Sequence, residues 1–249
     1  MGPGRLLLAA ASVVLVIGGL GYAAGQTVMA PRTLEPGVAG TTLLPQPEPS
    51  PTAPVPPPGT AQATTPQVDA DWVADVSARA GIPAPAVRAY ANAQLREPEG
   101  CEVGWTTLAG IGWIESQHGT VDGRTIGDDG RSSTPILGPA LDGDPFAAIR
   151  ATDETSAWHG DARWDHAVGP MQFIPSTWEQ WGSDGDGDGA ADPNDLDDAA
   201  ATAVAYLCAD GHDLTSGAGW SDAIFGYNHD GTYVANVHAA ASEYAERTS

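Results

Sequence analysis

Glu115 interrupts an apolar helical pattern, and its surroundings would suit acid–base chemistry. In the stretch WTTLAGIGWIESQHG, the positions close to one face of an expected helix are Trp105, Leu108, Ile111, Glu115 and His118. Gly119 is the expected helix stop, which places Glu115 in the last turn. Apolar burial and the partial negative charge of a helix C-terminus both raise the pKa of a carboxyl group. A raised pKa is what a general acid requires near neutral pH. The alternative is an ordinary glutamate on a solvated helix end.

A second group of residues, AVGPMQFIPSTW, could bind a sugar. Gly169 and Pro170 indicate a turn, which Met171, Gln172 and Phe173 follow. Aromatic, thioether and amide side chains on a turn can stack on a sugar and hydrogen-bond to it. Core packing is the alternative for Met171 and Phe173, whereas Gln172 fits poorly into a plain core.

The stretch SDGDGDGAADPND has the spacing of an EF-hand calcium loop, with glycine at the sixth position. The expected ligands, at positions one, three, five, seven (through its carbonyl), nine and twelve, are Asp184, Asp186, Asp188, Ala190, Asp192 and Asp195. The usual twelfth residue is Glu, so Asp195 is a departure from the pattern. We expect a structural calcium ion here and no cofactor for chemistry. A solvated acidic loop is the alternative.

Near the C-terminus, Tyr227 and Asn228 form a polar break, and Tyr233 follows at the start of an expected terminal helix. Half-buried packing with satisfied hydroxyl groups is the alternative for both tyrosines.

The elements that must position these residues are mostly helical. Helices are expected over 71–79, 83–95, 105–118, 175–181 and 196–207, at 223–227, and from Tyr233 to Tyr244. Residues 121–160 are rich in Gly, Asp and Thr, and we expect long loops with short strands around Arg124 and Ile136. The chain holds two cysteines, Cys101 and Cys208, which most simply form one disulfide outside the cytoplasm.

The N-terminus indicates export. A basic start at Arg5 precedes about twenty apolar residues, so 1–25 is expected to be a signal peptide or an uncleaved anchor, with 6–25 in the membrane. Residues 26–68 are rich in Pro and Thr and are expected to form a disordered linker. Residues 69–249 are the expected folded domain. The location is then the cell wall or the outer face of the plasma membrane.

The net charge is −22, with 32 acidic residues against 10 basic ones. Every basic residue is an arginine. Because phosphate binding requires basic patches, this charge argues against nucleic acid as a partner.

These stretches together resemble the lytic murein transglycosylases, in particular the transglycosylase B branch with its actinobacterial relatives. The motifs that carry the resemblance are LAGIGWIESQHG, TPILGP, AVGPMQFIPSTW, the DGDGDG loop and YNHDGTYVANV, over residues 82–244. The resemblance implies a lysozyme-like fold, α+β and predominantly α, with an EF-hand-type calcium loop and a sugar-binding groove.

The resemblance also implies roles for single residues. Glu115 would be the catalytic acid and base. The groove residues would be Gly169, Met171, Gln172, Phe173, Tyr227, Asn228 and Tyr233. Many relatives place Ser after Y-N-H, where this chain has Asp230, so a hydroxyl role there is not carried over.

The implied reaction cleaves peptidoglycan glycan strands between N-acetylmuramic acid and N-acetylglucosamine and closes a 1,6-anhydro ring. Glycosidases usually pair two carboxylates, but Asp165 is expected to be solvated, so a single glutamate fits substrate assistance. The alternatives are a hydrolytic muramidase of the same fold and a non-catalytic peptidoglycan-binding module. A di-metal site at the E-x-x-H pair lacks a matching pair. We expect a monomer.

Overall fold

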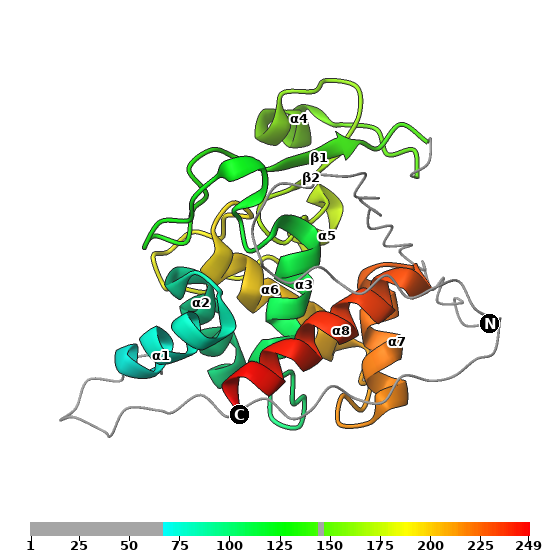
Figure 1. Ribbon diagram of the computed structural model, residues 1–249. Helices are drawn as coiled ribbons and strands as arrows, with labels where there is room; N and C mark the ends of the chain where they lie inside the picture. The colour runs from blue at the N-terminus through cyan, green and yellow to red at the C-terminus, as the bar shows by residue number, and fades with distance from the viewer. Residues whose placement is uncertain (1–66, 144–146) are drawn as a thin grey trace, which may run out of the picture.

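The computed structural model describes residues 67–143 and 147–249 (Figure 1). The described chain is mostly helical, with one small antiparallel sheet of two strands. The helices are α1 (Ala70–Ala80), α2 (Ala84–Leu95), α3 (Trp105–Ser116), α4 (Asp153–His159), α5 (Pro175–Trp181), α6 (Leu196–Ala209), α7 (Gly217–Tyr227) and α8 (Gly231–Thr248). The strands are β1 (Leu137–Ala140) and β2 (His166–Val168), and a 3-10 turn covers Val121–Gly123. This architecture agrees with the expected predominantly helical α+β class.

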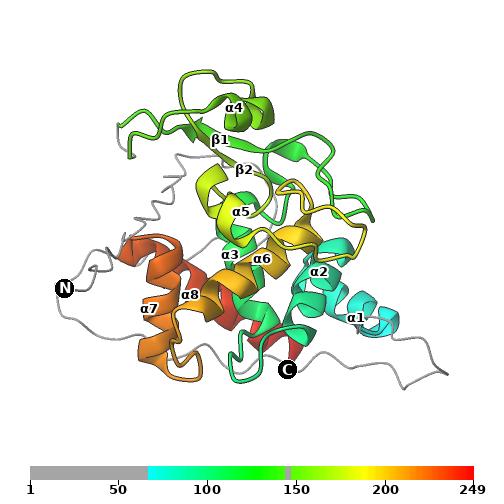
Figure 2. The same ribbon diagram turned by 180° about the vertical axis from the view of Figure 1, so that it is seen from behind.

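Helix α3 is the centre of the helical body, with α2, α6 and α8 around it (Figures 1 and 2). It is buried on nearly every side, so the expectation of one apolar face was wrong. Glycines allow this close packing, because a methyl group on Gly112 would overlap the Tyr90 hydroxyl and one on Gly110 would crowd the Val237 carbonyl. The helix also ends at Ser116, three residues before the expected stop at Gly119.

Side-chain caps start several of the helices. Asp69, Asp195, Ser216 and Asp230 each accept a backbone N–H at a helix N-terminus. The cap at Asp230 matters for the site, because it fixes the first turn of α8 and with it Tyr233.

A smaller lobe contains β1, β2 and α4 and lies above the helical body in Figure 1. The strands expected near Arg124 and Ile136 correspond to an isolated bridge between Ile126 and Ser132 and to β1. Helix α4 was missed inside the expected loop region. Its N-terminus has a capping box at Thr152 and Thr155, but Thr155 stands where the sequence signature has Glu or Gln, and no apolar periodicity follows.

The disulfide between Cys101 and Cys208 is confirmed, with the two Cα atoms 5.6 Å apart. It ties the segment before α3 to the end of α6. Val68 is already buried and donates its N–H to Asn92 Oδ1, one residue before the expected start of the domain. The expected signal or anchor segment at 1–25 and most of the linker at 26–68 lie outside the described residues. Among the described helices, none has the length and apolar character needed to cross a membrane.

Candidate active site

Glu115 lies in the last turn of α3, and its side chain is 4% exposed. The Tyr233 hydroxyl, from the first turn of α8, donates a hydrogen bond of 2.6 Å to Glu115 Oε1. Tyr233 therefore holds one carboxyl oxygen of Glu115 in place from the neighbouring helix.

Burial raises the pKa of Glu115 to about 8, because the ionised form loses its hydration. The hydrogen bond from Tyr233 acts in the opposite direction, since it stabilises the carboxylate. The carboxyl group is thus protonated at neutral pH, as the sequence pattern predicts. A protonated carboxyl group there can donate a proton and can take one back.

The Gly169–Phe173 turn is fastened to this helix end. Ser116, the neighbour of Glu115, donates from Oγ to the Pro170 carbonyl over 2.5 Å. Gly169 has φ of 78° and lies so close to the Pro193 carbonyl that no side chain fits there. This hydrogen bond between Ser116 and Pro170, 54 positions apart in sequence, therefore connects the turn to the end of α3.

Gln172 is fully enclosed and holds a left-handed backbone conformation, with φ of 51°. Its Nε2 donates to the Gly169 carbonyl over 2.8 Å, and its Oε1 is buried without a partner. Gly138 in β1 leaves room for this amide, because a methyl group there would lie 2.8 Å from Oε1. Gln172 thus combines an unpaired buried acceptor with a strained backbone conformation. Both features agree with the expectation that Gln172 fits poorly into a plain core.

Both C-terminal tyrosines are buried, not half-buried. Their rings are parallel, with centroids 6.5 Å apart. The Tyr227 hydroxyl donates to the Met171 carbonyl over 2.9 Å, and its ring packs against Phe173. Asn228, just after α7, is also buried. The structure thus connects Glu115 to Tyr233, Tyr233 to Tyr227, and Tyr227 to Met171 and Phe173 of the turn.

His118 does not share the Glu115 face, because it lies beyond α3 with φ of 60°. Its two ring nitrogens contact the hydroxyls of Tyr90 and Tyr244, at 3.2 and 2.8 Å. Burial lowers the pKa of His118 to about 3, so the ring is neutral. It connects α2 to α8 behind the glutamate, a role that the sequence pattern did not suggest.

Asp165 was expected to be solvated, and this was wrong. Its side chain is 5% exposed and accepts hydrogen bonds from Thr155 Oγ1 and His159 Nε2, at 2.6 and 3.2 Å. Both partners lie on α4, the helix that sequence reasoning missed. Asp165 therefore fastens α4 to the strand that leads into β2.

The acidic loop brings together three of its six expected ligands. Single carboxylate oxygens of Asp184, Asp186 and Asp188 all lie within 4.8 Å of one another, and the three side chains are exposed. Asp192 instead pairs with Arg131 Nη1 at 2.5 Å, and Asp195 lies 3.7 Å from Arg131 Nε. Ala190 is exposed and donates its N–H to Asp188 Oδ1.

Asp198, which sequence reasoning did not single out, closes the base of this loop. Its two carboxylate oxygens accept the N–H groups of Gly185 and Asp192, at 2.7 and 2.8 Å. Burial raises its pKa, and the nearby charges of Asp186 and Asp184 add to that effect.

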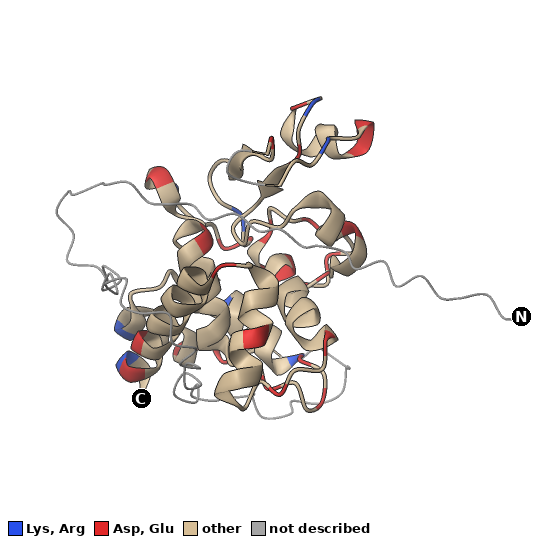
Figure 3. Ribbon diagram, turned by 90° about the vertical axis from the view of Figure 1, so that its right-hand side faces the viewer, with Lys and Arg blue, Asp and Glu red and all other residues tan. Residues whose placement is uncertain are grey.

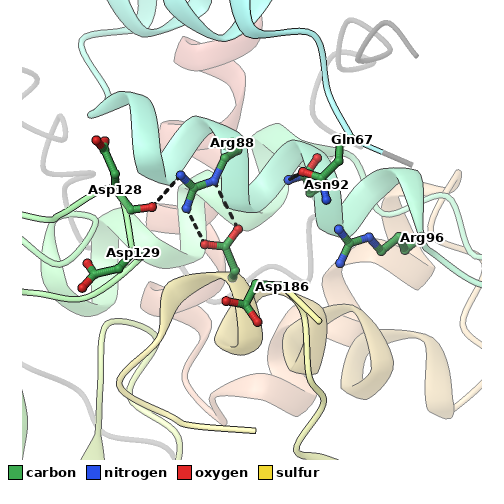
Figure 4. Close-up of a pocket in the computed structure, with 8 residues that line it drawn as sticks. Gln67, Arg88, Asn92, Arg96, Asp128, Asp129 and Asp186 are labelled. Carbon is green, nitrogen blue, oxygen red and sulfur yellow. Dashed lines mark hydrogen bonds and ion pairs between the residues drawn. The ribbon is translucent and has the colours of Figure 1, made fainter. Parts of the chain in front are cut away.

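A cavity of about 190 Å³ lies between α2, α6 and this loop (Figure 4). Across it, Arg88 contacts the Asp197 carboxylate at 2.6 Å and the Asp128 carbonyl at 2.8 Å. Arg96 donates to the carbonyl of Gly185 in the acidic loop. Glu115 does not line this cavity; Arg96 connects the acidic loop to α2, and Arg88 connects α6 to α2.

A second cavity, of about 200 Å³, borders the Gly169–Phe173 turn. Its walls are Arg131, Ser132, Pro135, Ile136, Gly169, Pro170 and Asn194. Asn194 Oδ1 is buried there without a partner. This hollow combines apolar walls with an unpaired polar acceptor, beside the turn that is fastened to the Glu115 helix.

Comparison with known families gives one match. Residues 146–240 match the sequence model of the transglycosylase SLT domain. The match covers the lobe from α4 onward, the Gly169–Phe173 turn and the Tyr227–Tyr233 segment, and it begins after Glu115. No curated protein and no solved structure matches the chain significantly. This part of the chain is therefore similar to transglycosylase SLT domains.

Proposed function

We propose that the protein is a lytic transglycosylase of the B-like branch, with Glu115 as its single catalytic acid and base. The observation that carries this proposal is the enclosed Glu115, held by Tyr233 and fastened to the Gly169–Phe173 turn. The family match over the following 95 residues supports it independently, because that region does not include Glu115.

In the proposed reaction, protonated Glu115 gives its proton to the glycosidic oxygen between N-acetylmuramic acid and N-acetylglucosamine. The substrate's acetamido oxygen stabilises the cationic carbon that remains. Glu115, now a carboxylate, accepts the proton of the muramyl C6 hydroxyl, whose oxygen closes the 1,6-anhydro ring. The Tyr233 hydrogen bond favours the carboxylate and so lowers the energy of this intermediate state.

The contacts of Asp165 favour substrate assistance over a two-carboxylate mechanism. Asp165, the candidate nearest to the turn in sequence, is occupied by Thr155 and His159.

Incubation of purified sacculi with the protein tests the proposal. We expect soluble fragments whose muramyl ends resist borohydride reduction. Reducible ends would indicate a hydrolytic muramidase instead. Binding to sacculi without any release would indicate a non-catalytic module.

Tyr233→Phe is expected to move the basic limb of the pH–activity profile to higher pH. The hydroxyl of Tyr233 lowers the pKa of Glu115, so its loss leaves burial unopposed and the pKa rises above about 8. The measurement is the pH dependence of kcat/KM on soluble glycan strands. Tyr227→Phe is the matched control, since that hydroxyl donates to the Met171 carbonyl and should leave the basic limb in place. Equal limbs in wild type and Tyr233→Phe would exclude this coupling.

We also propose that the acidic loop binds one calcium ion with a structural role. Asp184, Asp186 and Asp188 fit a hard cation, because one exposed carboxylate oxygen from each lies within 4.8 Å of the other two, so one ion could contact all three. Asp198 lies at the base of the loop and adds charge on the same side. Asp192 and Asp195 pair with Arg131, so the full set of ligands expected from the sequence remains a prediction.

Calcium is therefore expected to raise the melting temperature. At a concentration of about 10–100 times Kd the gain is about 1.5–3 kcal/mol, or several degrees. Asp188→Ala should abolish the shift. Asp222→Ala removes an equal charge from the exposed face of α7, and this variant should keep the calcium-dependent shift in melting temperature. If calcium shifts neither wild type nor the control, the loop is merely solvated.

A further inference from the structure

Two arginines in the small lobe, Arg150 and Arg163, flank Trp164. Unlike most other arginines of the described chain, they have no carboxylate partner within it. A bridge pairs Arg150 with Trp164 in antiparallel fashion, and the ladder continues as Asp165 donates its N–H to the Ile149 carbonyl. Asp165 is buried and Ile149 packs into the small core of the lobe. Because side chains alternate along a strand, Arg150 and Trp164 lie on the opposite, outer face.

The Arg150 guanidinium lies 3.9 Å from the centre of the Trp164 ring, and that of Arg163 lies 5.6 Å from it. Both arginines are exposed. A guanidinium stacked on an indole gains cation–π attraction and keeps its N–H edges free. The three side chains therefore present two oriented sets of hydrogen-bond donors to solvent.

Neither guanidinium forms an ion pair or a side-chain hydrogen bond within the described residues. In contrast, five other arginines have a carboxylate partner: Arg79, Arg88, Arg124, Arg131 and Arg247. Asp165, directly after Trp164, accepts hydrogen bonds from Thr155 and His159, and the nearest acidic residue before Trp164 is Asp161. Its carboxylate accepts the backbone N–H groups of Arg163 and Trp164, and it also faces His166.

This unpaired cationic pair stands out in a chain with a net charge of −22. Figure 3 shows basic segments in the small lobe, apart from the arginines of the helical body. Two guanidinium groups beside one ring repel each other unless an anion lies between them. Planar donors of this kind match a carboxylate, which they can bind through two hydrogen bonds.

The strand that carries Trp164 continues through His166 to Val168 and enters the Gly169–Phe173 turn directly. Four residues of strand correspond to ~13 Å. A peptide stem on a muramyl residue extends by about 3.3–3.6 Å per residue, so a stem of four or five residues spans that distance. The arginine pair thus lies within reach of a stem whose sugar occupies the site.

We propose that Arg150 and Arg163, with Trp164 between them, bind carboxylates of the peptide stems of peptidoglycan. This inference rests on the proposed function for the identity of the polymer. It assigns the small lobe a role in choosing peptide-bearing regions of the glycan.

Co-sedimentation with sacculi tests the proposal without requiring cleavage. The protein carries Glu115→Gln in every case, and the sacculi are freed of phosphate polymers by acid treatment. We expect it to bind untreated sacculi about three- to tenfold more tightly than sacculi whose carboxylates have been converted to amides, the range for two exposed ion pairs. Adding Arg150→Gln and Arg163→Gln should remove that difference. Arg79→Gln with Arg247→Gln makes the same change in charge at the α1–α8 end. This control should retain the difference in affinity between untreated and amidated sacculi.

The proposal is overturned if the protein with Arg150→Gln and Arg163→Gln still prefers carboxylate-bearing sacculi. It is also overturned if the protein that keeps both arginines shows no such preference. A preference that appears only before acid treatment would assign the pair to wall phosphates, which also overturns it. Release of fragments by the wild type is scored separately, so an inactive wild type would refute the proposed function without deciding the role of the arginines.

Discussion

Glu115→Gln is expected to lower the rate of peptidoglycan cleavage by about 10²–10⁴-fold, because general acid catalysis is typically worth that much. The amide keeps the size of the side chain and can still accept the Tyr233 hydrogen bond, but it cannot transfer a proton. The measurement is the initial rate of release of soluble fragments from sacculi at neutral pH. Activity within about tenfold of wild type would contradict a catalytic role.

Glu97→Gln is the matched control. Glu97 also has a raised pKa from burial, and its carboxylate accepts the Val103 N–H over 2.6 Å, away from the candidate site. This variant should remain active. A comparable loss of activity in both variants would point to a general defect in folding.

Glu115→Gln also predicts a change in how the stability of the folded protein depends on pH. The pKa of Glu115 is higher in the folded protein, about 8, than its ordinary value of 4.5, so the folded state binds more protons between these pH values. Wild-type stability therefore falls as pH rises from about 4.5 to about 8. Glu115→Gln lacks this loss, and its advantage should grow over that interval, with an upper bound of about 5 kcal/mol.

Removal of the disulfide is the second change with a large expected effect. Cys101→Ala with Cys208→Ala opens a loop of 107 residues, for which the chain-entropy argument gives about 4–5 kcal/mol. For a domain of this size the melting temperature should fall by about 10–20 °C. Calorimetry at neutral pH measures this change.

Reduction of the wild-type protein is the control, since it breaks the same bond without changing the sequence. Both samples should melt at the same lowered temperature. A melting temperature within about 2 °C of the oxidised wild type would show that the cross-link contributes little.

The helical body could be predicted because its signals are local. Pro83 and Pro175 lie at the starts of helices, and apolar residues recur along 196–207. The raised pKa of Glu115 was also predicted correctly, although the physical reason differs in part. The structure attributes it to full burial of α3, which a one-face helical pattern does not describe.

Other features depend on contacts between distant segments, which spacing alone does not reveal. Asp165 is occupied because α4 places Thr155 and His159 beside it, and α4 is a short helix with a weak pattern. Asp192 pairs with Arg131, which lies in a loop some sixty residues earlier in the sequence, so the EF-hand spacing could not show that pairing. His118 likewise meets Tyr90 and Tyr244 only in the folded chain.

Mass spectrometry of fragments released from sacculi in heavy-oxygen water tests the central claim most directly. If the muramyl C6 hydroxyl closes the ring after protonation by Glu115, every new muramyl end is a 1,6-anhydro end and contains no heavy oxygen. Reducing muramyl ends that carry one heavy oxygen would mean that water attacks the bond, which would contradict the proposed transglycosylase reaction.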